Sequence, residues 1–239
     1  MLLIECNPAQ SQELREYFSF FVPGHKFMPA FKRKVWDGKV RLFNQISKEL
    51  NVGLYQHLRR FCADRFYPLQ IIESPEFGHP EEKVHVNHQD LVKYLASLKA
   101  PYDVRDYQYD AIAHGIHNKR AILLSPTGSG KSFIIYNLMR WYLENQDQKV
   151  LVIVPTTSLV EQMYKDFQDY GLNVEECCHK VYSGKDKNTD MPIIISTWQS
   201  IYKLSSEWFE QFGAIFGDEV HGFKAKSLSG IMNKAKNAE

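Results

Sequence analysis

The sequence predicts two folded units, a small α+β unit followed by a larger α/β unit built on a parallel sheet. A chain of 239 residues is longer than most single domains. Residues 1–98 mix short apolar runs with amphipathic patterns, whereas beyond Tyr102 strand-like apolar runs alternate with longer helical patterns. With 44% apolar and 24% charged residues, the composition is that of a globular protein with enough apolar surface for a core in each unit.

The first unit is expected to open with a strand at residues 2–6 and a helix after it. Asn7 suits a helix cap, and Pro8 suits the first turn because no intrahelical partner exists there for a backbone N–H. Pro23 and Gly24 should end the segment. The apolar face of the helix would comprise Leu14, Tyr17, Phe18 and Phe21.

Three further elements complete the first unit. The Asp37-Gly38 pair lies between strand-forming residues and tolerates positive φ, which predicts a tight hairpin. After it, apolar residues recur at helical spacing, and a strand is expected at residues 69–72 behind Pro68. The helical positions are Leu54, Leu58, Phe61, Cys62 and Phe66.

The boundary between the units is expected near residues 73–87, which gather prolines, a glycine and charges without periodicity. His79, His85 and His88 are interpreted as linker residues, since no acid or cysteine joins them at ligand spacing. A short amphipathic helix through Leu91 and Leu98 could pack on either side. We therefore expect domains at residues 1–98 and 99–239.

The second unit should hold a parallel sheet with helices on both faces. Its candidate strands are nearly continuous apolar runs, which indicates burial on both sides. They lie at residues 121–124, 150–154, 180–182, 193–196 and 214–217.

Charge and cysteine usage exclude several classes of protein. A net charge of +1 gives no global attraction to a polyanion, so any such attraction must come from local clusters. The four cysteines show no spacing typical of a zinc site or a disulfide framework, which favours a reducing compartment. Without a basic leader or an apolar run of membrane length, we expect a cytoplasmic protein with no membrane contact.

Residues 125–132, Ser-Pro-Thr-Gly-Ser-Gly-Lys-Ser, follow an apolar run and open a helical pattern, which is the setting of a phosphate-binding loop. Small residues let successive N–H groups surround phosphates, and the helix N-terminus adds partial positive charge. Ser125 stands where the strict pattern has glycine. The expected ligands are ATP or GTP with Mg²⁺. The residues expected to hold them are Thr127, Gly128, Ser129, Gly130, Lys131, which reaches the outer phosphates, and Ser132, a metal ligand.

Two acids and a histidine follow the last predicted strand. Asp218 would hold Mg²⁺, and Glu219 would orient and deprotonate the attacking water. His221 would couple the nucleotide to the nucleic-acid side. Acids after a strand are more often solvated turn residues, but the loop upstream makes the pair specific. The sequence therefore predicts Lys131, Asp218, Glu219 and His221 as the catalytic group.

Gln108 lies ahead of the loop, and its carboxamide can donate to and accept from an adenine edge at once. That geometry would favour ATP over GTP. A surface glutamine is the alternative reading, and it would be preferred if no phosphate loop followed.

A basic segment with interleaved aromatic residues occupies residues 25–43. Cations suit phosphates and rings suit bases, a combination typical of nucleic-acid binding. The rings could equally face the core beneath a solvated hairpin. The cations expected to contact nucleic acid are Lys32, Arg33, Lys34, Lys39 and Arg41.

Five segments in this order resemble the motifs of superfamily 2 helicases. They are residues 105–108 (RDYQ), 125–132, 154–162 (VPTTSLVEQ), 196–200 (STWQS) and 218–221 (DEVH). The resemblance implies a RecA-like first motor domain with a phosphate loop. It places Gln108 on adenine and puts Pro155, Thr156, Gln162 and Thr197 along the nucleic-acid path.

Outside these motifs, residues 16–20, 36–42, 141–145 and 207–213 are similar to the UvsW-type recombination helicases of phages. That likeness implies an N-terminal domain that recognises branched or forked DNA. We also expect a monomer, which acts in the host cytoplasm if a phage encodes it. The chain ends before the next motif and the second RecA-like domain of such motors. We therefore expect weak hydrolysis from this portion alone, since that domain supplies an arginine finger.

Three other functions remain open at the level of sequence. An RNA helicase is one, because no residue here tests for a 2′-hydroxyl. A nucleic-acid-binding module without catalysis is another. A small-molecule kinase is the third, although Gln108 before the loop and Thr197 after it argue against it.

Overall fold

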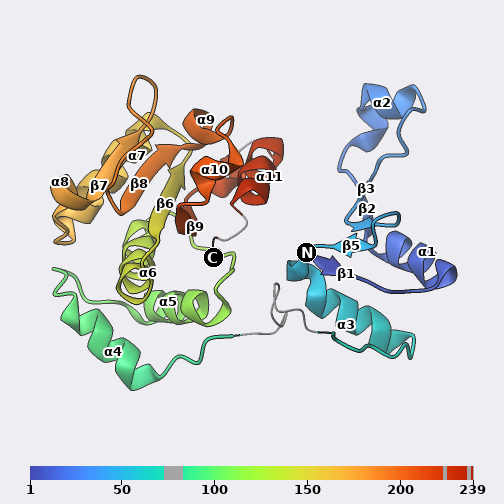
Figure 1. Cartoon of the computed structure of the whole chain (residues 1–239), viewed down its shortest axis with the longest axis horizontal. Coiled ribbons are helices and arrows are strands. Elements are labelled where there is room, and N and C mark those ends of the chain that lie inside the picture. Colours follow the sequence, from blue (N-terminus) through green and yellow to red (C-terminus); the bar gives the residue numbers. More distant parts are fainter. Residues whose placement is uncertain (73–82, 223–224, 236–237, 239) are drawn as a thin grey trace. The chain divides into compact units, whose positions relative to one another are not determined.

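The computed structural model describes all residues except 73–82, 223–224, 236–237 and 239, and divides into unit 1, Met1–Glu82, and unit 2, Lys83–Glu239 (Figure 1). Much of the expected linker, including His79, lies outside the described residues. The division falls ahead of the expected boundary at residues 98 and 99. Helix α4 (His88–Ser97) belongs to unit 2 because its Leu91 is buried against Ile112 and Leu138.

The described residues of unit 1 combine short strands with three α-helices. Asn7 caps α1 as expected, because its side chain accepts a hydrogen bond from Gln10 N at 2.9 Å while the Gln10 side chain accepts one from Asn7 N. The core of the unit gathers Leu14, Phe43, Leu50, Leu58 and Phe61. Its elements are β1 (Leu2–Leu3), α1 (Pro8–Tyr17), β2 (Ser19–Phe21), η1 (His25–Phe27), α2 (Pro29–Lys32), β3 (Lys39–Arg41), β4 (Phe43–Asn44), β5 (Glu49–Leu50), η2 (Val52–Leu54) and α3 (Tyr55–Asp64).

Three sequence predictions for unit 1 were wrong. No hairpin turns at Asp37-Gly38, because β3 pairs antiparallel with the distant β2, in the register Phe20 to Val40. Phe21 lies on β2 and not on the first helix, which ends at Tyr17. Residues 69–72 form no strand, since a strand needs a partner ladder and this segment has none among the described residues.

Unit 2 is built on a parallel sheet in the strand order β7-β8-β6-β9. Four predicted strands are confirmed, although β7 begins and ends earlier than expected. The elements after α4 are α5 (Asp106–Asn118), α6 (Lys131–Asn145), β6 (Lys149–Val154), α7 (Thr157–Asp169), α8 (Val174–Cys177), β7 (Cys178–Val181), β8 (Ile193–Thr197), α9 (Trp198–Ile201), α10 (Ser206–Phe209), β9 (Phe212–Gly217), η3 (Val220–Gly222) and α11 (Ala225–Lys234).

The predicted strand at residues 121–124 was wrong. The described sheet ends at β9, and the segment ahead of the phosphate loop makes no ladder with it. Ile122 and Leu124 are 84% and 96% exposed, and only Leu123 packs on the helices of unit 2. An apolar run indicates strand propensity, but pairing depends on where the chain lies.

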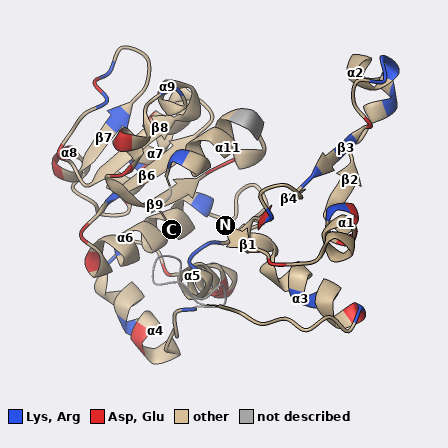
Figure 2. Cartoon of the chain, turned by 45° about the vertical axis from the view of Figure 1, so that its right-hand side comes forward, with Lys and Arg blue, Asp and Glu red and all other residues tan. Residues whose placement is uncertain are grey.

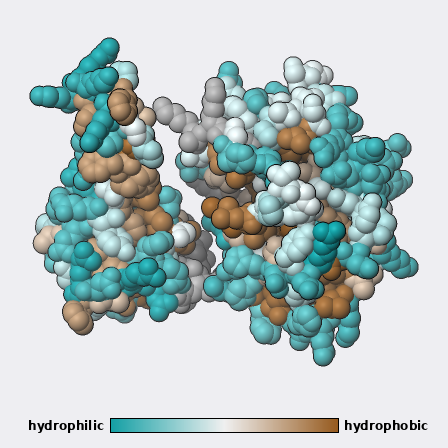
Figure 3. Space-filling model, turned by 180° about the vertical axis from the view of Figure 1, so that it is seen from behind, coloured by the Kyte–Doolittle hydropathy of each residue, from teal (hydrophilic) through white to brown (hydrophobic). Residues whose placement is uncertain are grey.

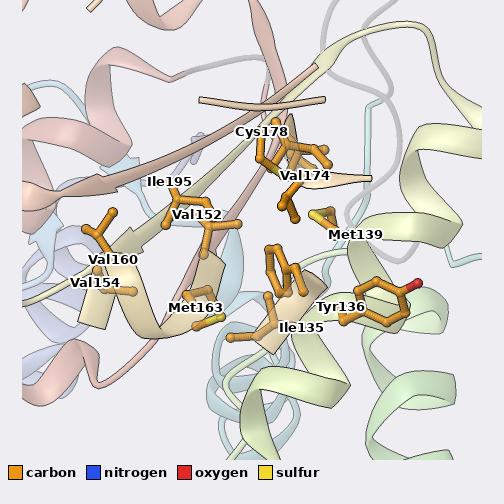
Figure 4. Close-up of a cluster of buried hydrophobic side chains, with 14 of the residues drawn as sticks. Ile135, Tyr136, Met139, Val152, Val154, Val160, Met163, Val174, Cys178 and Ile195 are labelled. Carbon is orange, nitrogen blue, oxygen red and sulfur yellow. The ribbon is translucent and has the colours of Figure 1, made fainter. Parts of the chain in front are cut away.

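Helices cover both faces of the sheet, as the near-continuous apolar strands predict. On one face, Val152 and Ile195 meet Met139 of α6 and Met163 of α7 (Figure 4). On the other, Leu151 and Ile194 pack with residues of α9, α10 and α11. The carboxyl ends of β6, β8 and β9 therefore share one edge, which is where ligands of such sheets bind. No helix in the described part of the chain has the length and apolar character needed to cross a bilayer.

Candidate nucleotide site

The phosphate loop is shaped by two glycines and ends where α6 begins. Gly128 and Gly130 have φ of 79° and 78°, a left-handed conformation that glycine adopts without steric cost. A Cβ on Gly130 would lie 2.5 Å from Gln108 Nε2, so a side chain there would collide with the glutamine. Lys131 and Ser132 form the first turn of α6, at the positive end of a helix of 15 residues.

Gln108 is buried against the loop. Its Nε2 donates to the carbonyl of Ser129 at 2.9 Å, and its Oε1 accepts from Arg105 N at 3.1 Å. The carboxamide therefore ties the start of α5 to the loop. A contact with adenine would use its second N–H and the second lone pair of its oxygen.

Tyr107 makes a second hydrogen bond to the Ser129 carbonyl. The sequence did not predict this contact. Its hydroxyl donates to Ser129 O at 3.1 Å and accepts from an Arg105 guanidinium N at 3.1 Å. The only signal in the sequence is its place beside Gln108, because the loop carbonyl becomes its neighbour only through folding.

One member of the acid pair, Glu219, contacts the loop directly. Lys131 Nζ forms a hydrogen-bonded ion pair with Glu219 Oε1. Asp218 N donates to Ile153 O at 2.9 Å, which continues the β6–β9 pairing and brings both acids to the carboxyl edge of the sheet. Glu219 has φ of 49°, an unfavourable conformation for a residue with a side chain, and such strain concentrates at functional sites.

The two carboxylates have opposite pKa shifts. The hydrogen bond from Lys131 lowers the pKa of Glu219. Burial raises the pKa of Asp218, and the neighbouring Glu219 charge raises it further. The Lys131 ammonium gains from the same pair, since the Glu219 hydrogen bond raises its pKa. The ion pair therefore stabilises the charged forms of both Lys131 and Glu219.

His221 lies at the outer side of this group. Its Nδ1 is 3.3 Å from Glu219 Oε2, and its side chain is 82% exposed. The structure thus brings Lys131, Glu219 and His221 into one chain of contacts, open to solvent at the histidine.

Ser132 has a partner that the sequence did not indicate. Its Oγ lies 2.8 Å from the hydroxyl of Tyr170, which follows α7. Tyr170 in turn packs edge-on against Phe133, with ring centroids 4.9 Å apart. The orientation of the Ser132 hydroxyl is therefore set by a residue that only the fold brings near.

The donor chemistry of Ser132 and Asp218 suits Mg²⁺. A hydroxyl and a carboxylate are hard oxygen donors, and Mg²⁺ in nucleotide sites takes one or two protein ligands beside phosphates and waters. Among the described residues, no cluster of three or more His, Cys, Asp or Glu could hold a metal by itself. Ser132 and Asp218 therefore suit a metal whose other ligands are phosphates and waters.

Of the residues expected along a nucleic-acid path, Pro155, Thr156 and Thr197 lie at the carboxyl ends of β6 and β8, and Gln162 lies on α7. Thr156 is exposed and caps α7, accepting from Leu159 N at 3.3 Å, and Gln162 is exposed further along the same helix. Gln199 Nε2 donates to Pro155 O at 3.1 Å, which links the loops after β6 and β8. Thr197 is only 5% exposed, and its Oγ1 lies 2.9 Å from Ser200 Oγ, so its side chain is turned inward.

The basic segment lies in unit 1, around α2 and β3, where Lys and Arg gather in Figure 2. Lys32, Arg33 and Lys34 are exposed, and Lys39 Nζ lies 4.9 Å from the centre of the Phe21 ring. Arg41 is paired with Asp37, which neutralises part of the local charge.

Two family models match the chain. Residues 1–72 match the N-terminal region of DNA helicase UvsW, and residues 101–239 match the res subunit of type III restriction enzymes. The second match covers more than half of the chain.

Individual relatives of the chain are also named as DNA helicases or translocases. The ATP-dependent DNA helicase UvsW of Enterobacteria phage T4 is 37% identical over 98% of this chain and 47% of its own length. A crystal structure of UvsW from bacteriophage T4 matches with a TM-score of 0.86 at 36% identity, covering 98% of this chain and 84% of that one. The DNA 3′-5′ translocase XPB2 of Sulfurisphaera tokodaii is 28% identical over 89% of the chain and 41% of its own length. The chain thus spans about half the length of these curated relatives.

Proposed function

This chain belongs to the UvsW family of DNA helicases, and we propose on that premise that it binds and hydrolyses ATP to drive movement along DNA. One observation carries the proposal beyond family membership. The lysine of the phosphate loop and the glutamate after β9 are in direct contact, although they are far apart in the sequence. A triphosphate held by the loop would therefore meet the acid that activates water.

In this proposal the nucleotide is held mainly by backbone groups. The N–H groups of residues 127–132 bind phosphate oxygens at the start of α6, and Lys131 binds the outer phosphates as a point charge. Gln108 supports the loop from behind and faces adenine with its remaining polar capacity. Ser132 and Asp218 hold the metal, and Mg²⁺ when bound neutralises charge on the phosphates.

Glu219 is the proposed base for the attacking water. Its carboxylate is held by Lys131, which lowers its pKa and makes it a poor proton acceptor. Phosphates that draw Lys131 away would restore the basicity of Glu219 next to the water. His221, in contact with Glu219 and exposed to solvent, is placed to pass the state of the nucleotide to bound nucleic acid.

The substrate we propose is branched or forked DNA, bound by a monomer in the cytoplasm of the infected host. The relatives are named as DNA helicases and a DNA translocase, which supports DNA over RNA. The basic segment of unit 1 would recognise the substrate. In unit 2, Pro155, Thr156 and Gln162 would line the path of the DNA strand. Thr197 would contact that DNA strand through its backbone, since its side chain is turned inward.

Replacing Lys131 tests the proposal. We expect Lys131→Ala to lower the affinity for ATP at least about 10-fold, because hydrogen bonds to charged groups each contribute roughly 1.5–3 kcal/mol. DNA-stimulated hydrolysis should be lost with it. The matched control is Lys165→Ala, which removes an exposed lysine of α7 in the same unit. Unchanged ATP affinity in Lys131→Ala would contradict the assignment of the loop, and wild-type protein that hydrolyses ATP equally without DNA would contradict the motor.

A further inference from the structure

Residues 22–38 form an excursion between β2 and β3, here called the arm, and the arm contains an open cavity of about 590 Å³. Phe31, Val35 and Trp36 supply its apolar wall, and Lys26, Lys32, Lys34 and one acid, Asp37, complete the lining. At this end of unit 1, hydrophilic residues crowd around hydrophobic ones (Figure 3). The volume lies within the range of small-ligand sites.

The wall of the cavity is fixed by packing at the base of the arm. The ring of His25 stacks on Phe21 at 4.8 Å and meets the edge of Phe31 at 4.9 Å, while its Nδ1 bonds Val22 O at 2.9 Å. The indole Nε1 of Trp36 donates to Lys39 O at 2.9 Å. Two of the three wall side chains are therefore held in place before any ligand arrives, which lowers the entropy cost of binding.

The positive charge around the cavity favours an anionic ligand. Among the described residues, Lys26, Lys32, Arg33 and Lys34 take part in no ion pair. The single acid of the arm, Asp37, is already engaged by Arg41 and by the backbone N–H of Lys39. Four cations on so short a segment repel one another, and phosphates lying among them would relieve that repulsion.

Two features of the arm lower the stability of the fold when no ligand is bound. Val35, which lines the cavity, is 76% exposed. Lys34 has φ of 59° at the end of α2, where glycine would avoid the steric cost of a left-handed residue. A ligand with both a phosphate and a flat apolar face would compensate for these costs.

We propose that this cavity takes one unpaired nucleobase of a DNA strand whose phosphates lie along Lys26, Lys32 and Lys34. The inference rests on the proposed function and deepens it, because it states which part of a branched substrate unit 1 recognises. Bases in a duplex stack on their neighbours and cannot enter, so the cavity selects single-stranded arms and frayed junctions. Trp36 provides the aromatic face on which the base stacks. The lysines bind the phosphates of single-stranded and of duplex DNA equally well.

Two substitutions at one position separate stacking from structure. The leucine of Trp36→Leu and the phenylalanine of Trp36→Phe are similar in size, and neither can donate the hydrogen bond to Lys39 O. Only phenylalanine keeps an aromatic face. The probe is an oligothymidylate with a single 2-aminopurine, whose emission falls when the base stacks, compared with a duplex of equal length carrying the same base paired. Binding is measured on the whole chain.

We expect wild-type protein to quench the single strand, and Trp36→Leu to lose that quenching together with roughly 10-fold or more in single-strand affinity. Trp36→Phe should keep most of both, and duplex affinity should not change in either variant. Lys32→Ala should weaken strand and duplex equally and leave the quenching at saturation unchanged. Identical behaviour of the leucine and phenylalanine variants, including joint loss of folding, would overturn the proposal. The proposed function is judged separately by ATP affinity in Lys131→Ala, which shares no residue with the arm.

Discussion

At the scale of single residues, the Lys131–Glu219 pair creates a competition within the site. The ammonium that a triphosphate needs is held by the carboxylate that activates water. Nucleotide binding must therefore break an ion pair whose side chains are 26% and 32% exposed, and thus partly screened by solvent. The cost is modest, but it opposes binding directly.

We accordingly predict that Glu219→Gln binds ADP and ATP several-fold more tightly than wild-type protein. A neutral amide holds Lys131 more weakly than a carboxylate does, so more of the ammonium is available to the phosphates. Hydrolysis should fall roughly 10²-fold or more, because a general base contributes about that much. Titration with a fluorescent nucleotide and a steady-state hydrolysis assay measure the two effects.

Glu161→Gln is the matched control for this prediction. Glu161 accepts hydrogen bonds from Lys180 at 2.8 Å and from Tyr182 at 2.7 Å, so the substitution weakens another lysine–glutamate pair of unit 2. Nucleotide affinity should stay at the wild-type value. Equal or weaker nucleotide binding by Glu219→Gln would show that the carboxylate does not compete for Lys131.

Residue identity predicted the chemistry of the site but not its supports. Lys131, Asp218 and Glu219 could be named from sequence because phosphate and water activation require those groups at the ends of strands. Tyr107 and Tyr170 could not, since a tyrosine hydroxyl has no preferred partner until folding places a carbonyl or a serine beside it. Gln108 was expected on adenine, and both its polar atoms also hold the protein backbone.

At the scale of elements, helix α4 joins unit 2 through one fully buried leucine and one partly buried tyrosine. Leu91 is 0% exposed in the cluster formed with α5 and α6. Tyr94 packs edge-on against Trp141 at 4.8 Å, and its buried hydroxyl has no hydrogen-bond partner among the residues that the structure describes. Burial raises the pKa of Tyr94 well above the ordinary value, so the group stays neutral.

These two residues should affect stability in opposite directions. We predict that Leu91→Ala lowers the free energy of unfolding of unit 2 by about 2–5 kcal/mol, because it leaves a cavity. Tyr94→Phe should raise the free energy by roughly 1 kcal/mol, since it removes a hydroxyl that is desolvated without compensation. Urea denaturation of the two variants and wild-type protein measures both changes. A loss of stability in Tyr94→Phe would mean that the hydroxyl has a bonding partner such as water.

Element prediction succeeded where a segment defines its own environment and failed where a distant partner does. The strands β6, β8 and β9 were recognisable because a strand covered on both faces needs a nearly continuous apolar run. Residues 121–124 have the same character but pair with no strand in the described structure. Asp37-Gly38 has hairpin chemistry, yet β3 pairs with β2, and Gly38 is needed because a Cβ there would lie 2.5 Å from the His25 ring.

At the scale of the whole molecule, the two chemistries of the proposed motor lie in different units. The phosphate loop and the acid pair belong to unit 2, whereas the unpaired cations of the arm belong to unit 1. The net charge of +1 hides this division, because acids elsewhere balance the arm. The distribution of charge along the chain is therefore more informative than the net charge. Variants of the arm should change DNA binding without changing nucleotide binding.

Lys34→Gly tests that division with three measurements. We predict weaker DNA binding, with the slope of log affinity against log salt reduced by about 0.7–0.9, the value of one lost phosphate contact. Affinity for ATP should not change. Unit 1 should become more stable by up to about 1 kcal/mol, because glycine adopts the positive φ of this position without steric cost.

Lys48→Gly provides the comparison for that variant, since Lys48 also has positive φ, 60°, and also lies in unit 1, but outside the arm. Both substitutions remove one positive charge and relieve one left-handed side chain. Lys48 Nζ donates to Ser11 Oγ at 2.6 Å, so its role is internal and its loss should leave the salt slope unchanged. Equal slopes in the two variants would mean that position on the arm is irrelevant and that only net charge draws DNA. Different slopes at equal charge would place a phosphate at Lys34, and the retained left-handed lysine would then be explained by binding.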